Sequence, residues 1–281
     1  MVKWHSERRY MILISGSSGF LGSRLVSRLS SLGHQIVKVT QEELFQPKLL
    51  GELFEKHKPE YIFHLASYGN HSNQDDIPMT LFSNIFGVSN MLLASKDIPY
   101  KCFVNFSSSS VKLPTETFYS ASKLGGEHIV NAFRTKFDKP ILNVRPYSVY
   151  GEQEKAFRFI PTVCTDLLTD SLLYLDPSPV HDWIYIEDFI DGVLLGMDHP
   201  ELQDLDIGTG IKTSNGDVVK KLEDLSNRKL NIVFQRGLRS YDNKDWVCDT
   251  TKLKSLGWKQ KTTLEEGLKK VYEEYKKRLN S

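Results

Sequence analysis

Tyr119 and Lys123 stand four residues apart and follow a run of four serines, residues 107–110. On a helix, residues with this spacing lie on one face, and a lysine ammonium beside a phenol favours the phenolate. Such a tyrosine can exchange a proton with a hydroxyl or carbonyl oxygen, and a serine hydroxyl can hydrogen-bond the same oxygen. A Tyr-x-x-x-Lys pair is common by chance, so its catalytic interpretation depends on the surrounding elements.

A glycine-rich turn near the N-terminus supports the catalytic interpretation of this pair. A short apolar run, residues 10–14, is followed by Gly16, Gly19 and Gly22, and an amphipathic segment then begins. This strand–turn–helix context is typical of a dinucleotide-binding fingerprint, although a merely structural turn is the alternative. Gly16 suits the turn, Gly19 lets a pyrophosphate lie against the main chain, and Gly22 lets the helix pack on the strand. The positive end of the helix dipole would then face the phosphates.

Composition narrows the class of protein. Of 281 residues, 40% are hydrophobic and 25% are charged, which is typical of a globular chain with a substantial core. The net charge of +1, without a basic block, argues against nucleic acid and against an anionic membrane surface. The three dispersed cysteines match neither a metal site nor a disulfide framework and indicate a reducing compartment. With no long apolar run and no signal peptide recognised, we expect a cytoplasmic protein without a membrane segment.

Strand and helix patterns alternate through the first half of the chain. The strands expected after the first are residues 35–40, 61–66, 101–107 and 140–145. The helices expected after the first are residues 44–57, 79–95 and 119–137. Short connections between such elements predict an α/β fold with a doubly wound parallel sheet, the Rossmann architecture. The cofactor crevice of such a sheet lies at the carboxyl ends of the strands, where the glycine turn, the serines and Tyr119 would converge.

The second half is less regular. Helices are expected at residues 157–169, 187–197, 216–225 and over the last 20 residues, and strands at 172–175, 182–186 and 205–208. We therefore predict a dinucleotide-binding domain over residues 1–150 that carries the catalytic residues. A smaller, mainly substrate-binding region would cover residues 151–281, with segments near 182–210 returning to the first domain.

Together these motifs resemble an extended short-chain dehydrogenase/reductase of the NAD(P)-dependent nucleotide-sugar epimerase/dehydratase superfamily. The resemblance runs from end to end of the chain. Besides the glycine turn, the serine run and the Tyr–Lys pair, it rests on residues 64–66, 84–87, 145–151, 182–188, 206–210 and 256–258.

The resemblance implies a role for each matching residue. Tyr119 and Lys123 would be catalytic together with Ser108 or Ser109, because the short loop after the serines leaves that alignment open. The residues implied at the cofactor are Gly16, Ser18, Gly19, Phe20, Leu21, Leu65, Ala66, Ser67, Asn84, Tyr119, Lys123, Pro146 and Tyr147. Arg239 would bind the substrate diphosphate, whereas His181 replaces a second arginine of the family. A homodimer is also a family-level expectation.

Two further residues are candidates for substrate binding because they stand next to the cleft in sequence. These are Tyr68 and His71. A lone loop histidine is more commonly polar surface, so both remain open.

Two departures from the family pattern narrow the reaction. Val111 follows the serine run where 4,6-dehydratases need acids, which argues against a dehydratase. The link from Ser109 to Tyr119 is short and resembles that of 4-ketoreductases, particularly CDP-paratose and CDP-abequose synthase-like enzymes. The stretch 66–71 is also similar to that group. The sequence therefore favours reduction of the 4-keto group of a nucleotide-linked deoxysugar, with a nucleotide-sugar 4-epimerase as the alternative.

The end of the second strand bears on the cofactor. NAD-preferring relatives have an acid there that holds the ribose hydroxyls, whereas this chain has Thr40, which tolerates a 2′-phosphate. Lys38 lies two residues earlier and on the same side of the strand. This favours NADP(H) over NAD(H), although Lys38 could simply cover the sheet edge. A non-catalytic, cofactor-sensing binding protein is a remote alternative, since such proteins typically lose the Tyr–Lys pair that is present here.

Overall fold

The computed structural model describes residues 8–71, 73–114, 117–237 and 246–279, which form two compact units. Unit 1 comprises Met1–Lys112, Glu116–Arg145 and Val193–Leu205, and unit 2 comprises Leu113–Thr115, Pro146–Gly192 and Asp206–Ser281. The first stretch of unit 2 after Arg145 begins at Pro146, and β6 (Ser148–Tyr150) pairs within that unit. The segment Val193–Leu205, which belongs to unit 1, lies within the stretch 182–210 that we expected to return.

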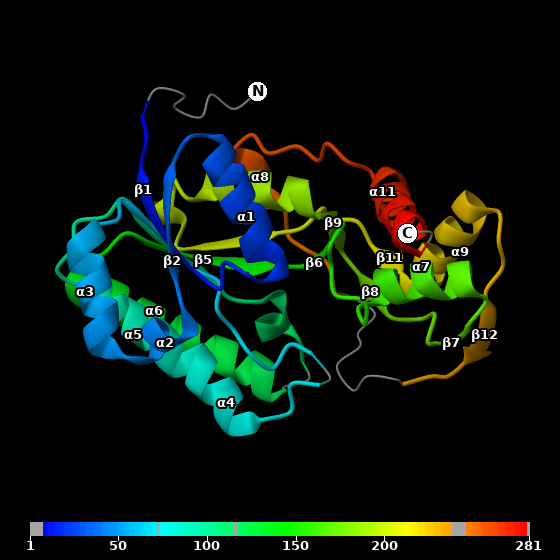
Figure 1. Ribbon diagram of the computed structural model, residues 1–281, viewed down its shortest axis with the longest axis horizontal. Helices are drawn as coiled ribbons and strands as arrows, with labels where there is room; N and C mark the ends of the chain where they lie inside the picture. Colours follow the sequence, from blue (N-terminus) through cyan, green and yellow to red (C-terminus); the bar gives the residue numbers. More distant parts are fainter. Residues whose placement is uncertain (1–7, 72, 115–116, 238–245, 280–281) are drawn as a thin grey trace. The chain divides into compact units, whose positions relative to one another are not determined.

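The predicted parallel sheet is confirmed and has six strands in the order β10-β5-β4-β3-β1-β2 (Figure 1). The strands are β1 (Met11–Ser15), β2 (Gln35–Val39), β3 (Tyr61–His64), β4 (Cys102–Phe106), β5 (Ile141–Pro146) and β10 (Asp204–Ile207). Strands β3 and β4 are buried throughout, as expected for central parallel strands covered on both faces. The strand β2 lies at an edge, and Val39 is its only buried residue.

The strand order reverses between β1 and β3, because the chain passes from β1 to β2 and then returns to the other side of β1. In the parallel register Ser15 pairs with both Val39 and His64, so the three strands end level with one another. The residues that follow them therefore emerge at one edge of the sheet. Ligands of open α/β sheets bind at such a reversal, outside the carboxyl ends of the strands.

Helices cover both faces of this sheet (Figure 1). Their bounds in unit 1 are α1 (Phe20–Ser31), α2 (Gln41–Phe45), α3 (Pro47–His57), α4 (Ile77–Leu81), the π-helical turn η1 (Phe82–Phe86), α5 (Gly87–Ser95), the 3₁₀ turn η2 (Ser109–Lys112), α6 (Phe118–Phe137) and the 3₁₀ turn η3 (Pro200–Leu202). Right-handed crossovers place α1 on one face, and α3, α5 and α6 on the other. Leu50, Phe54, Met91 and Val130 from these three helices pack on the sheet.

Two expected helices differ in detail. The helix expected at 44–57 is two helices, α2 and α3, because Pro47 lacks the N–H that a continuous helix would need. The helix expected at 79–95 begins at Ile77, where the carboxylate of Asp76 caps it, and it contains the π-helical turn η1. Such turns are frequent at functional sites.

The segment Ile77–Ser95 is long and apolar enough to cross a bilayer by length and composition, although about 39% of it is buried within the protein. Serine, threonine and asparagine interrupt it, so its sequence contains no long uninterrupted apolar run. A core helix of a soluble protein meets the same criterion. Here the segment contacts α3 and α6.

Unit 2 contains short paired strands and four helices of eight residues or more, among the described residues. Its elements are β6 (Ser148–Tyr150), α7 (Phe159–Thr169), β7 (Leu172–Leu175), β8 (Val180–His181), β9 (Trp183–Tyr185), α8 (Ile186–Gly196, which ends in unit 1), β11 (Thr213–Ser214), α9 (Asn215–Ser226), β12 (Asn231–Phe234), α10 (Thr251–Ser255) and α11 (Leu264–Leu279). The strand expected at 182–186 is the shorter β9, because Asp182 precedes it and Ile186 already begins α8. The buried carboxylate of Asp182 accepts hydrogen bonds from the N–H groups of Thr209, Gly210 and Cys248.

Candidate active site

The glycine turn connects β1 to α1 and is tightly packed. Gly16 has φ +69°, and a Cβ there would lie 2.5 Å from the backbone nitrogen of Ala66. A Cβ on Gly22 would lie 2.1 Å from the carbonyl oxygen of Gly16. Both positions therefore require glycine, for the turn and for close packing of helix on strand.

The middle glycine is different. A Cβ on Gly19 would meet nothing closer than 3.4 Å, so packing within the protein does not explain this glycine. Gly19 is the N-cap residue of α1, and the first turn of that helix contains no acidic residue. An anion can therefore approach the main chain and the N–H groups of the helix. The turn therefore fits the pyrophosphate of a dinucleotide, and the roles of Ser18, Phe20 and Leu21 beside it stay predictions.

The residues after β3 lie against this turn. The N–H of Leu65 donates to the carbonyl oxygen of Ser15 over 3.2 Å, and Ala66 is the residue that a Cβ on Gly16 would strike. The structure thus brings the predicted cofactor residues Leu65, Ala66 and Ser67 beside the glycine turn, on the other side of the strand-order reversal.

His64 at the end of β3 was not singled out as a site residue. Its Nδ1 lies 2.7 Å from Ser15 Oγ, and only 2% of its surface is exposed. Burial, and then the positive charge of Lys123, lower the pKa of His64 to about 3. A neutral histidine here ties β1 to β3 and adds no charge to the site.

Asn84 lies in the π-helical turn and uses its side chain within the protein. Its Oδ1 accepts from the N–H of Tyr68 over 3.0 Å, and its Nδ2 donates to the carbonyl oxygen of Tyr68 and to Ser122 Oγ, both at 2.8 Å. Both N–H donors of the amide are therefore in use. Asn84 holds the loop that carries Tyr68 against α6, one residue before Lys123.

Tyr119 and Lys123 lie one turn apart on α6, as the spacing predicted. A reciprocal capping box between Thr117 and Ser120 begins this helix immediately before them. The side chain of Lys123 is 6% exposed, and its Nζ donates to the carbonyl oxygen of Phe106 over 2.5 Å. Burial lowers the pKa of Lys123 to about 8, and the negative charge of Glu127 opposes that shift.

The serine run begins directly after Phe106, at the carboxyl end of β4. Ser108 Oγ lies 2.8 Å from Ser110 Oγ and accepts from the N–H of Ser110, whereas Ser109 is 2% exposed and begins η2. The turn η2 contacts α6, so the serines and the Tyr–Lys face share one region. Ser107, which the sequence did not single out, has a buried hydroxyl without a hydrogen-bond partner among the described residues.

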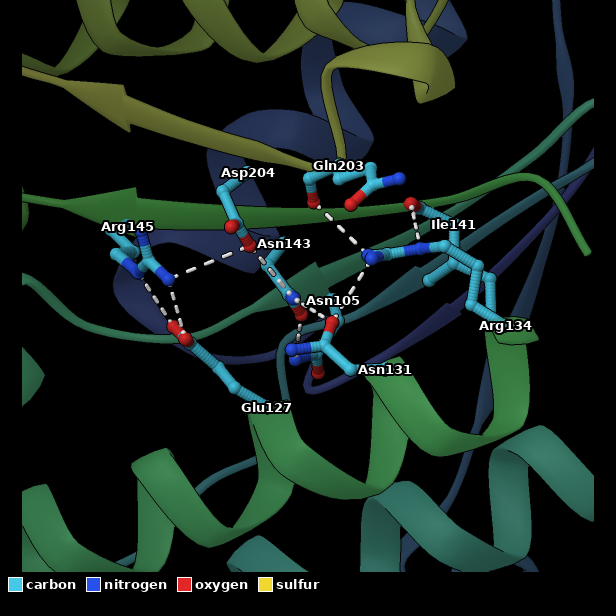
Figure 2. A network of polar contacts seen from close by, with 9 residues as sticks. All are labelled: Asn105, Glu127, Asn131, Arg134, Ile141, Asn143, Arg145, Gln203 and Asp204. Carbon is cyan, nitrogen blue, oxygen red and sulfur yellow. Dashed lines mark hydrogen bonds and ion pairs between the residues drawn. The ribbon is translucent and has the colours of Figure 1, made fainter. Parts of the chain in front are cut away.

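A buried ion pair stands one turn beyond Lys123 on the same helix face. Arg145 donates to both carboxylate oxygens of Glu127, at 2.7 and 2.6 Å, and Asp204 lies 3.5 Å from the same guanidinium (Figure 2). Asn143 Nδ2 donates to Asp204 over 3.0 Å and continues the network across β5 (Figure 2). Sequence reasoning missed Glu127, although its position four residues after Lys123 was a usable signal.

The same network holds the far half of α6. Asn105 Nδ2 donates to Asn143 Oδ1 over 2.9 Å, which links β4 to β5. Arg134 donates to the carbonyl oxygens of Ile141 and Gln203 (Figure 2). The helix that carries Tyr119 and Lys123 is therefore fixed along its length against β4 and β5.

The remaining predicted residues lie elsewhere. Pro146 ends β5 and belongs, with Tyr147, to unit 2. His71 lies on the loop between β3 and α4, where its carbonyl oxygen accepts from the N–H of Gln74. Arg239 lies outside the described residues, so its predicted role is untested.

Lys38 and Thr40 both have exposed side chains at the end of β2. The Thr40 hydroxyl is hydrogen-bonded to Glu43, whose carboxylate therefore lies at the position where we noted that an acid was missing.

Comparison with known proteins gives a consistent result. The model of the NAD dependent epimerase/dehydratase family matches residues 12–208. A dTDP-D-glucose 4,6-dehydratase of Dictyostelium discoideum is 24% identical over 96% of this chain and 82% of its own length. A UDP-glucose 4-epimerase of Mycolicibacterium smegmatis is 24% identical over 93% of this chain and 97% of its own.

Solved structures show the same fold. The UDP-glucose 4-epimerase of Thermotoga maritima, crystallised with UDP-glucose, superimposes with a TM-score of 0.86 at 24% identity. The alignment covers 96% of this chain and 99% of that one.

Proposed function

This chain belongs to the NAD dependent epimerase/dehydratase family, and on that premise we propose that it reduces the 4-keto group of a nucleotide-linked deoxysugar. The observation that carries the proposal is the hydrogen bond from Lys123 Nζ to the carbonyl oxygen of Phe106. It holds the Tyr–Lys face of α6 at the start of the serine run. A proton donor, a cation and hydroxyl groups thus lie together at the edge of the sheet where the glycine turn also lies.

A nicotinamide dinucleotide, when bound at the glycine turn, supplies the hydride. Tyr119 gives its proton to the C4 carbonyl oxygen as that oxygen gains charge, and the phenolate that remains recovers a proton from solvent. Lys123 stabilises this phenolate electrostatically. Ser108 or Ser109 donates a hydrogen bond that orients the oxygen. Tyr68 and His71, on the loop held by Asn84, would contact the sugar, and Arg239 the diphosphate.

Two features favour the ketoreductase over other reactions of the family. No acid follows the serine run, since η2 continues with Val111 and Lys112, which argues against dehydration despite the dehydratase among the relatives. The connection to α6 is short, and its described part contains the 3₁₀ turn η2 before the cap at Thr117. A trimmed connection of this kind is why we propose a CDP-paratose synthase-like reductase.

A nucleotide-sugar 4-epimerase is the second candidate. It is favoured by the Mycolicibacterium smegmatis epimerase, which this chain matches over nearly the whole length of both proteins. The same residues would serve, but Tyr119 would remove and return a proton within one catalytic cycle. The dinucleotide would remain bound and would not be consumed.

One experiment distinguishes the two. The purified protein is supplied with CDP-linked 4-keto-6-deoxysugars and NADH or NADPH, and dinucleotide oxidation at 340 nm is compared with product formation by chromatography. A ketoreductase oxidises one reduced dinucleotide per product. An epimerase interconverts UDP-glucose and UDP-galactose without added reductant. Dinucleotide binding without turnover of any nucleotide sugar would instead indicate the non-catalytic binding protein.

The proposal includes a cytoplasmic location and a homodimer. The location follows from the dispersed cysteines and from the packing of Ile77–Ser95 within unit 1. Both are checked by fractionation and by light scattering of the purified protein.

A further inference from the structure

The end of β2 carries a carboxylate that the sequence pattern did not reveal. Thr40 directly follows β2, and the register that pairs Ser15 with Val39 places it beside Gly16, the first glycine of the turn. An acid at this point of a Rossmann sheet accepts hydrogen bonds from the ribose hydroxyls of NAD and repels the 2′-phosphate of NADP.

Glu43 occupies this point by means of a capping box. Its Oε2 accepts from the N–H of Thr40 over 2.8 Å and from Thr40 Oγ1 over 2.9 Å. In return, Thr40 Oγ1 accepts from the N–H of Glu43 over 3.1 Å. The carboxylate therefore lies against Thr40, the residue at the strand end where the ribose of a bound dinucleotide is expected. A carboxylate offers about four acceptor positions, so about two remain for a ligand.

A second acid stands beside Glu43. Glu42 and Glu43 both lie in the first turn of α2. Lys38 is the nearest cation along β2 and stands two residues, or about 7 Å along the strand, before Thr40. Glu43 is hydrogen-bonded directly to Thr40.

We propose that Glu43, held by Thr40, takes the place of the missing strand-end acid and selects NAD(H) over NADP(H). This inference rests on the proposed dinucleotide site, and it reverses the preference for NADP(H) that Thr40 alone suggested. The residue that determines cofactor specificity would then be Glu43 on α2, three positions after Thr40 at the end of β2.

Direct binding tests the inference without catalysis. NADH and NADPH are titrated into the wild-type protein and followed by nucleotide fluorescence and calorimetry. We expect NADH to bind about tenfold more tightly, because a carboxylate and a phosphate a few ångströms apart repel each other by this order. Glu43→Gln keeps a hydrogen-bonding group for the cap but loses the charge, and it should tighten NADPH binding about tenfold while changing NADH binding less.

Two control variants separate this effect from general changes. Glu42→Gln removes the same charge from the neighbouring residue and should leave the NADH to NADPH ratio unchanged. Lys38→Ala should not weaken NADPH selectively, as it would if Lys38 bound the 2′-phosphate. Circular dichroism of each variant confirms that it is folded.

The outcomes are distinct. Tighter binding of NADPH than of NADH by the wild type, or an unchanged ratio in Glu43→Gln, overturns this inference and leaves the proposed reaction standing. Selective NADH binding without turnover of any nucleotide sugar supports this inference and overturns the proposed reaction.

Discussion

The two ends of the predicted dinucleotide site are built in different ways. At the catalytic end, Lys123 and Glu127 are 6% and 3% exposed, and a bidentate contact from Arg145 fixes the helix (Figure 2). At the adenosine end, Thr40 and Glu43 interact on the surface of a five-residue helix. Buried charges depend on their partners, whereas an exposed acid can be replaced at little cost. The helix of the proposed catalytic pair is therefore rigidly fixed, whereas the contacts proposed to select the cofactor are easily changed.

The largest expected effect lies at the catalytic end. Tyr119→Phe removes the proton donor and keeps the ring, so kcat should fall by about 10²–10⁴-fold while NADH binding is retained. Steady-state kinetics and fluorescence titration on the same preparation measure both. Near-wild-type turnover would exclude Tyr119 as the acid. Tyr174→Phe, which changes an exposed tyrosine of unit 2, is the matched control.

Glu127→Gln tests whether burial makes this end fragile. It removes the charge of the closer of the two carboxylates that contact the Arg145 guanidinium, whose side chain is 14% exposed, and leaves the contact with Asp204. Loss of one partner from a buried pair costs about 3–5 kcal/mol of the free energy of unfolding. Urea denaturation measures this loss, and Glu265→Gln, which breaks the exposed pair with Lys221, should cost less than about 1 kcal/mol. If both variants lost the same free energy of unfolding, the buried pair would be no more important for stability than the exposed one.

The same variant should shift a pH profile. Protonated Lys123 supports the phenolate, so kcat/KM should fall as pH rises through the Lys123 pKa of about 8. The charge of Glu127 raises that pKa, so Glu127→Gln should move the alkaline limb to lower pH by up to about one unit. Asp204→Asn, which also contacts Arg145 but is one third exposed, should move the limb less. An alkaline limb that stays at the same pH would show that the charge of Glu127 does not influence the pKa of Lys123.

Burial of Lys123 also makes a prediction for stability. The folded lysine titrates near pH 8 and the unfolded one near 10.5, so the unfolded chain binds more protons between these values. The free energy of unfolding contributed by this group should therefore rise with pH across that window. Urea denaturation between pH 8 and 10.5 tests the sign, and Lys123→Met should abolish this contribution.

The smallest effect is expected at the adenosine end. Thr40→Val keeps the branched shape but removes the hydroxyl from the capping box, which should cost about 1 kcal/mol. Thermal unfolding measures the loss. A loss of stability as large as that of Glu127→Gln would show that the adenosine end, at the end of β2, is no easier to change than the catalytic end.

The sequence determined the parallel sheet and the glycine turn, because strand and helix periodicity, the positive φ of Gly16 and the close approach of Gly22 to Gly16 are local properties. It also placed Tyr119 and Lys123 on one face of a helix, since four residues make about one turn. The break at Pro47 was readable in the same way, although we expected one continuous helix there.

Only the tertiary structure decided what surrounds these residues. Burial lowers the pKa of Lys123, and the carboxylate of Glu127, which Arg145 holds, opposes that shift. Glu43 at the end of β2 depends on a side-chain contact that reaches back to Thr40. Spacing along the sequence shows which residues can lie close together. Burial and side-chain direction decide which charged groups actually interact, and both are established only when distant segments pack together.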